Sequence, residues 1–145
     1  MEEALKKKTP KENQTARDFF GIQARNLAKL NSEGVKIGFG TDSSNQVGWT
    51  VHTELADMVT AGMTPAQVIR AATQTAAEIV KLDQLGEVAA GKSADFIVLD
   101  ANPLDNINNT RRISKVYLRG KEIDRAALRA SFSGNTDTGN TGPAK

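Results

Sequence analysis

The sequence predicts an α/β protein, in which an extended segment follows one amphipathic helix and precedes another, with a small β-rich region after them. Three observations support this class. Residues 35–43, VKIGFGTDS, alternate between apolar and small or polar side chains, as a strand does. Residues 64–81 open with a helix-start signature and continue as a helical apolar stripe. Residues 94–100, ADFIVLD, contain an unbroken apolar run.

Composition is that of an ordinary folded domain with little tendency to bind polyanions. The chain has 145 residues, 39% hydrophobic and 25% charged, and its net charge is only +2. The basic excess lies in residues 1–30, and few aromatics accompany it, so nucleic-acid binding is not expected. With no cysteine, disulfides and thiolate zinc sites are excluded.

No apolar run approaches the length of a membrane span, and the N-terminus lacks the apolar core of a signal peptide. We therefore expect no membrane association. The compartment stays open, with the cytoplasm as the default and export of a parent enzyme as the alternative.

The first helix is expected from about Asn13, because apolar side chains then recur at helical spacing through Phe20, Ala24 and Leu27. Residues 1–12 look frayed or foreign to the fold. Gly34 ends the helix, since glycine is the residue most favoured just past a helix C-terminus. A helix that feeds a strand through so short a turn is half of an α/β repeat.

The strand at residues 35–43 places Val35, Ile37 and Phe39 on one face and leaves the other face almost bare of side chains. The carboxylate of Asp42 is expected in that open space, at the C-terminal end of the strand. In a barrel of parallel strands, catalytic loops converge at that end. An ordinary turn residue or helix N-cap is the alternative for Asp42, and the strand alone leaves both open.

Two helices are expected after a loop at residues 43–52. The first is short and ends at Gly62. The second begins at residues 64–67, TPAQ, where Thr as N-cap, Pro at the first helical position and Gln three residues after the cap form a capping box. Its apolar stripe runs to about Lys81.

The C-terminal third is predicted to be β-rich. The run at residues 94–100 reads as a strand buried on both faces, and residues 102–105 read as a turn. A second strand covers 113–118, and Arg119-Gly120 joins it as a tight hairpin to residues 121–123. From Ser131 the tail lacks apolar periodicity and is expected to be disordered.

Two glycine-rich stretches match phosphate-binding patterns only in their letters. Residues 86–93, GEVAAGKS, satisfy the P-loop pattern, but a helix precedes them and a strand follows, which inverts the order that the motif requires. Residues 38–43 have Ser43 where a dinucleotide fingerprint has its third glycine. Nucleotide binding at 86–93 is kept as a minor alternative.

His52 is the only histidine of the chain. His52-Thr53-Glu54 resembles half of the zinc-deaminase signature, whose other half needs cysteines that are absent. One histidine with scattered carboxylates cannot by itself form a three-histidine zinc site. His52 is either a substrate-pocket residue or a partly buried histidine beside Trp49.

Several stretches together resemble the C-terminal portion of a metal-dependent amidohydrolase, in the branch of imidazolonepropionase-like and prolidase-like enzymes. They are GTD at the strand end, AGMTPAQVIRAAT at the helix start, and GEVAAGKSADFIVLD further on. The resemblance covers about residues 17–128. It implies a (β/α)8 barrel whose mouth binds one or two divalent metals, with a small β-sandwich beside it.

The resemblance also implies roles for particular residues. The Asp that closes the eighth strand in this family binds metal and moves the proton of the attacking water, and Asp42 holds that position. The expected reaction is hydrolysis of amide or cyclic amide C–N bonds in a small-molecule or dipeptide-like substrate, with zinc as the expected metal. His52 is the additional substrate-binding candidate.

The family's HxH pair and further histidines lie upstream of the matched region, and this sequence lacks them. We therefore expect a C-terminal fragment that is inactive alone and binds metal only with the missing barrel half. The expected organisation is a disordered 1–12, a barrel segment at 13–85, a sandwich segment at 86–128 and a disordered 129–145. The fragment is expected to self-associate or to bind a complementary barrel chain. A non-catalytic or split-enzyme partner that completes a barrel supplied by another chain is the alternative.

Overall fold

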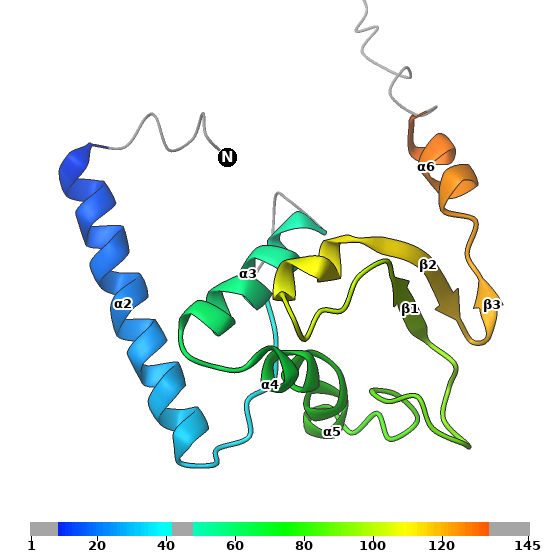
Figure 1. Cartoon of the computed structure of the whole chain (residues 1–145), viewed down its shortest axis with the longest axis horizontal. Helices are drawn as coiled ribbons and strands as arrows, with labels where there is room; N and C mark the ends of the chain where they lie inside the picture. The colour runs from blue at the N-terminus through cyan, green and yellow to red at the C-terminus, as the bar shows by residue number, and fades with distance from the viewer. Residues whose placement is uncertain (1–8, 42–47, 134–145) are drawn as a thin grey trace, which may run out of the picture.

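The computed structural model describes residues 9–41 and 48–133 and shows a mixed helix and sheet structure, as the sequence predicts (Figure 1). A long N-terminal helix and a short C-terminal helix project from a central group of helices and a small sheet. In chain order the elements are α2 (Pro10–Ser32), α3 (Trp49–Thr60), α4 (Pro65–Arg70), the π-helical stretch η1 (Ala71–Thr75), α5 (Ala76–Ile79), β1 (Phe96–Leu99), the 3-10 helix η2 (Ile107–Arg111), β2 (Ile113–Leu118), β3 (Lys121–Glu122) and α6 (Arg125–Ser133).

Helix α2 begins three residues before the expected Asn13. Thr9 is its N-cap, with the Thr9 backbone N–H donating to Glu12 Oε2 at 2.7 Å and the Glu12 N–H donating back to Thr9 Oγ1 at 3.3 Å. Pro10 occupies the first helical position. This reciprocal pair is a capping box, so the prediction that residues 10–12 are frayed is wrong.

The expected strand at residues 35–43 is not part of a sheet over its described portion, residues 35–41. A strand needs a neighbour to satisfy its backbone groups, and here the Phe39 N–H donates instead to the Ala71 carbonyl of η1 at 3.0 Å. The alternation still holds, because Ile37 and Phe39 pack against the core while Lys36 and Gly40 are exposed. Val35, predicted to share their face, is 48% exposed.

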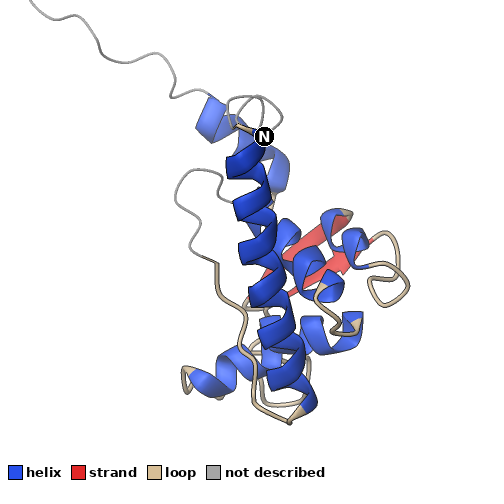
Figure 2. Cartoon of the chain, turned by 90° about the vertical axis from the view of Figure 1, so that its left-hand side faces the viewer, coloured by secondary structure: helices blue, strands red, loops and turns tan. Residues whose placement is uncertain are grey.

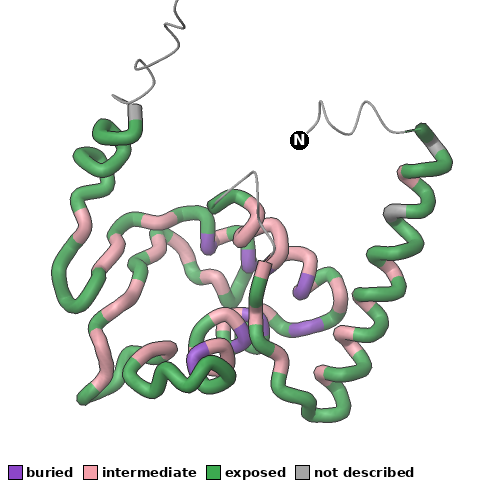
Figure 3. The backbone as a smooth tube through the Cα atoms, turned by 180° about the vertical axis from the view of Figure 1, so that it is seen from behind, coloured by how far each residue is buried: buried purple, intermediate pink, exposed green. Residues whose placement is uncertain are grey.

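The core lies where α3, α4 and η2 meet, and Figure 3 shows the buried positions gathered there while α2 and α6 remain mostly exposed. Val68, on α4, is fully buried. The α3 helix starts at Trp49, earlier than expected, so its first turns also face η2. The buried cluster comprises Leu55, Met58, Met63, Val68, Ala71 and Ile107.

The second predicted helix forms as α4, η1 and α5, and its capping box is confirmed by the Thr64 and Gln67 bonds. The chain then turns back so that Gly86 packs against this helix. A methyl group at Gly86 would lie 2.8 Å from Ala77 Cβ and 2.9 Å from Gln74 Cα, closer than real side chains approach. Gly86 therefore occupies a position that only glycine fits.

The β-rich region is one antiparallel sheet in the order β1-β2-β3 within the described ranges. Phe96 pairs with Tyr117, and their rings stack with centroids 4.6 Å apart. The prediction that β1 is buried on both faces is wrong, since Ile97 is 47% and Val98 39% exposed. The reason is that the described residues form a single sheet, so no second sheet among them covers that part of β1.

The predicted tight hairpin is confirmed, with Arg119 and Gly120 at φ of 50° and 77° between β2 and β3. Helix α6 follows, and it extends to Ser133. The prediction of a structureless tail is therefore wrong for residues 129–133, while 1–8 and 134–145 lie outside the described residues. The described helices include none long and apolar enough to cross a membrane.

Candidate functional site

The predicted catalytic residue Asp42 lies outside the described residues. The described chain reaches Thr41 on one side and resumes at Gly48, the N-cap of α3. The catalytic and metal-binding roles of Asp42 therefore stay predictions.

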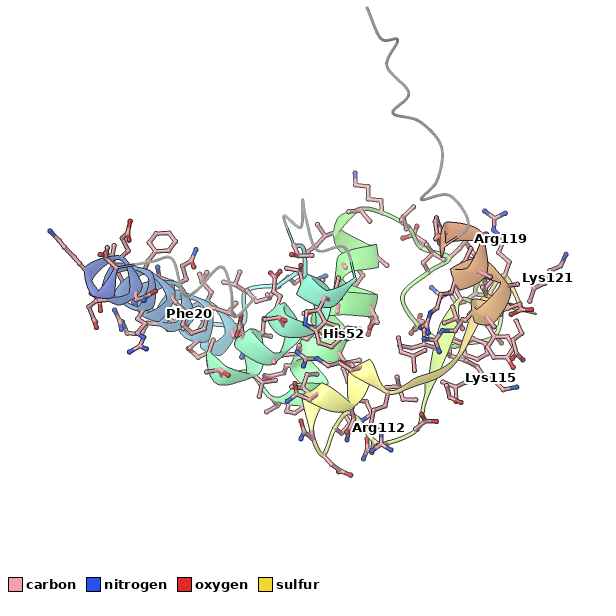
Figure 4. The ribbon with its side chains drawn as sticks, turned by 90° about the horizontal axis from the view of Figure 1, so that it is seen from above. Phe20, His52, Arg112, Lys115, Arg119 and Lys121 are labelled. Atoms are coloured by element: carbon pink, nitrogen blue, oxygen red, sulfur yellow. The ribbon has the colours of Figure 1, made fainter. Side chains whose placement is uncertain are left out.

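His52 lies in the first turns of α3 and faces η2 (Figure 4). Its Nδ1 is 3.1 Å from Thr110 Oγ1. The Thr110 hydroxyl donates its only proton to the Ile107 carbonyl at 2.8 Å. Because that proton is committed, Thr110 Oγ1 accepts from His52, which assigns the imidazole proton to Nδ1. Nε2 then carries the lone pair and can accept a hydrogen bond.

Burial lowers the pKa of His52 below its ordinary value, and the positive charge of Arg111 lowers it further. Both effects disfavour the imidazolium, so the neutral ring is the form present at neutral pH. A neutral imidazole with a fixed tautomer can accept a proton or a hydrogen bond at Nε2.

Acidification is expected to destabilise the protein through His52. Its folded-state pKa lies below the ordinary value of 6.5, so the unfolded chain binds this proton more readily. The contribution is fully present above pH 6.5 and is lost as the pH falls from there through the lowered folded pKa. The free energy of unfolding should therefore fall more across this window in the parent than in His52→Gln, which keeps a donor but does not titrate.

Asp57 acts in the opposite direction at lower pH. Burial raises its pKa above 3.8, so protonation of its carboxyl adds stability as the pH falls through that raised value. The parent and His52→Gln both contain Asp57, so the difference between their unfolding free energies as a function of pH isolates the contribution of His52. Identical profiles would show that His52 does not titrate differently in the folded state.

A second contact joins α3 and η2 beside His52. The Arg111 guanidinium carbon lies 5.0 Å from the centroid of the Trp49 ring, within the range of a cation–π interaction. From the sequence, Trp49 was predicted only as a neighbour of His52, and Arg111 was not among the predicted site residues. The available signal was the doublet Arg111-Arg112 at the end of a turn-rich stretch, which does not specify a partner.

A groove of about 380 Å³ lies between α2 and α3. Figure 2, seen from the α2 side, shows α2 as a separate rod in front of the rest of the chain. The walls combine Phe20 and Leu27 of α2 with Asp57 and Met58 of α3. Burial raises the pKa of Asp57, which was not among the predicted site residues because it lies between apolar positions of its helix. This groove does not include His52.

The P-loop pattern at residues 86–93 has the inverted context that the sequence predicts. Helix α5 precedes it and β1 follows it. The Lys92 ammonium, which would contact phosphate in a true P-loop, donates to the Asp83 carbonyl and pairs with Glu87 at 3.2 Å. With no helix start facing the loop in this described stretch, these residues lack the geometry of a phosphate cradle.

The described side chains do not form a metal-binding cluster. They include no group of three or more His, Cys, Asp or Glu residues placed to hold a metal ion. The described part of the chain therefore does not by itself fit a divalent metal.

The model of the amidohydrolase family matches residues 2–123. This chain belongs to the amidohydrolase family. The resemblance inferred from the sequence is confirmed, including the imidazolonepropionase-like and prolidase-like branch. Members of the family generally bind divalent metals.

Relatives of this amidohydrolase-family chain carry several enzyme names. Adenine deaminase from Oleidesulfovibrio alaskensis is 38% identical over 128 residues, which cover 80% of this chain and 21% of that protein. Imidazolonepropionase from Deinococcus radiodurans is 28% identical over 109 residues, covering 71% of this chain and 27% of that protein. The chain thus spans about a quarter of the length of these relatives.

Solved structures agree with the family assignment. A Xaa-Pro dipeptidase with methionine in its active site superposes with a TM-score of 0.65 at 33% identity, covering 69% of this chain and 25% of the dipeptidase. Molinate hydrolase gives a TM-score of 0.67 at 29% identity, covering 83% of this chain and 30% of the hydrolase. These neighbours are amidohydrolase-type barrel enzymes.

Proposed function

We propose that this chain is the C-terminal part of a (β/α)8-barrel amidohydrolase that hydrolyses C–N bonds of amide or cyclic amide substrates. The observation that carries the proposal is the family match over residues 2–123. The names of the relatives, which include deaminases and a dipeptidase, support hydrolysis at C–N bonds as the shared chemistry. The barrel segment would be residues 13–85 and the sandwich segment residues 86–128.

Asp42 is the proposed general base, taking a proton from the attacking water and returning it to the leaving nitrogen. It is also the proposed metal ligand of this chain. Since the described residues hold no cluster of metal-binding side chains, metal would be retained only when histidines of the preceding barrel strands are present. Zinc is the expected ion.

His52 is the proposed substrate-binding residue. Its Nδ1–H is held by Thr110, so Nε2 can accept an N–H from an amide or dipeptide-like substrate. The fixed tautomer supports this role, because an acceptor that needs no reorganisation binds a donor at lower cost.

Dependence on further barrel strands is supported by the surface around residues 35–41. This segment has no strand neighbour among the described residues, and Ile79, whose side chain lies against Gly38, is 53% exposed. The alternative, a non-catalytic chain that completes a barrel supplied by another chain, has the same support. The two differ in whether Asp42 is needed for turnover.

Complementation tests the proposal. The chain alone should show no detectable amide hydrolysis and only weak divalent-metal binding. Co-expression with the N-terminal barrel segment of a relative, carrying the HxH pair and later histidines, should yield a complex that retains metal and hydrolyses the substrate of that relative. Metal content and turnover are measured on the purified complex, with the N-terminal segment alone as control. Turnover by that segment alone, or a metal-loaded complex without turnover, would contradict a catalytic role.

A further inference from the structure

We propose that Arg111, held over the ring of Trp49, is the recognition group of a binding site for a small oxyanion, either a carboxylate or a phosphate. The site lies where the first turn of α3 meets the C-terminal end of η2. It goes beyond the proposed hydrolysis, because it concerns ligand recognition and its test requires no turnover.

The charge of Arg111 is not neutralised within the described part of the chain. The ion pairs found there are Lys36–Glu78, Lys92–Glu87 and Lys115–Glu122, and none of the described carboxylates pairs with Arg111. Arg111 is also exposed. Its charge acts on His52, where it adds to burial in lowering the imidazole pKa. An oxyanion at Arg111 would meet a positive charge that no carboxylate of the described residues already cancels.

One contact positions the Arg111 side chain, and another anchors the residue before it. Stacking on Trp49, with the guanidinium carbon 5.0 Å from the ring centroid, fixes the guanidinium while leaving edge N–H groups able to donate. The preceding residue, Thr110, is buried and accepts from His52 Nδ1 at 3.1 Å. A guanidinium already ordered on an aromatic face loses less side-chain entropy on binding than a free arginine does. Its planar pair of donors matches the two oxygens of a carboxylate or phosphate.

The neighbouring Arg112 provides a matched control. It has the same charge, is exposed, and lies at the C-cap of η2, one residue before β2 and apart from His52 (Figure 4). Its described bonds are made by the backbone: the Arg112 carbonyl accepts from the Asp100 N–H at 2.9 Å, and the Arg112 N–H donates to the Asn109 carbonyl at 3.0 Å. Replacing the Arg112 side chain therefore removes one positive charge and leaves both backbone bonds and the Trp49 contact in place.

The single tryptophan makes the site directly observable, because Trp49 fluorescence reports on the stacked guanidinium. The full chain is titrated at neutral pH with sodium acetate and with sodium phosphate, against sodium chloride at equal ionic strength. We expect a saturable change with at least one oxyanion, at millimolar concentrations, beyond the effect of chloride. The anion that binds more tightly, acetate or phosphate, identifies the ligand class as a carboxylate or a phosphate.

Substitutions at Arg111 and Arg112 test whether Arg111 binds the oxyanion. Arg111→Gln should weaken binding about tenfold or more, the scale of a lost charge-assisted pair. Arg111→Lys should also bind more weakly, because it keeps the charge but loses the planar fork. Arg112→Gln should bind like the parent. Calorimetry gives the affinities without relying on Trp49. A parent response equal to chloride, or equal weakening in Arg111→Gln and Arg112→Gln, would overturn the proposal and leave the hydrolysis proposal unaffected.

Discussion

Replacing Asp42 with Asn is expected to lower turnover of the complemented enzyme by about two orders of magnitude or more, the usual scale for a positioned general base. Asn keeps the size and shape of the side chain, and it removes both the negative charge and the basic oxygen. The loss should appear in kcat rather than only in KM, because the proton is transferred during the chemical step. Turnover is measured on the complex of this chain with the N-terminal barrel segment.

Asp42→Glu is the matched variant for this test, since it retains the carboxylate and shifts it by one methylene. It should lose less turnover than Asp42→Asn if basicity is the main requirement. Metal content is measured on each complex, because a loss of metal and a loss of the base both lower turnover. Near-parental turnover in Asp42→Asn would remove Asp42 from the mechanism and favour the non-catalytic, barrel-completing alternative.

Local signals were sufficient to predict several elements of the fold. The capping box at residues 64–67 and the Arg119-Gly120 hairpin each depend on residues within a few positions of one another, so the sequence shows them directly. The same signature is present at residues 9–12, TPKE, within the stretch that was predicted to lie outside the fold. Its Thr, Pro and Glu match the capping pattern as well as the predicted box does.

Non-local features could not be predicted from the sequence. Alternation at residues 35–41 indicates which side chains face the core, and Ile37 and Phe39 do, but it cannot say what satisfies the backbone. The bond from the Phe39 N–H to the Ala71 carbonyl depends on how a helix distant in sequence packs.

The candidate site illustrates the same limit. His52 was identified as the only histidine, but its partner Thr110 is 58 residues away, and the contact between Trp49 and Arg111 spans a similar separation. Nothing local marks these pairs. The family resemblance gave Asp42 its proposed role, because the bare face of one strand leaves a turn residue and a general base equally open.

Replacing Gly86 with Ala is expected to lower the free energy of unfolding by about 3 kcal/mol, the largest effect on stability that we predict for a single added methyl group. Two costs combine. Gly86 has a φ of +92°, which an L side chain rarely adopts, and such strain costs about 1–3 kcal/mol. The added Cβ would also lie 2.9 Å from Gln74 Cα and 3.0 Å from the Thr73 carbonyl oxygen, and overpacking of this kind typically costs about 1–3 kcal/mol more.

Gly91→Ala separates the two costs, because Gly91 has a φ of +83° and nothing within 4 Å of an added Cβ. This substitution should lower the free energy of unfolding by only about 1 kcal/mol, from backbone strain alone. Urea unfolding of both variants and the parent, followed by circular dichroism, gives the comparison. The atoms that Gly86 would strike belong mainly to the helix backbone of η1, which cannot rotate away as a flexible side chain can. Equal losses in the two variants would mean that the loop at residues 82–93 moves off η1 at little cost, and that Gly86 is required only for its backbone conformation.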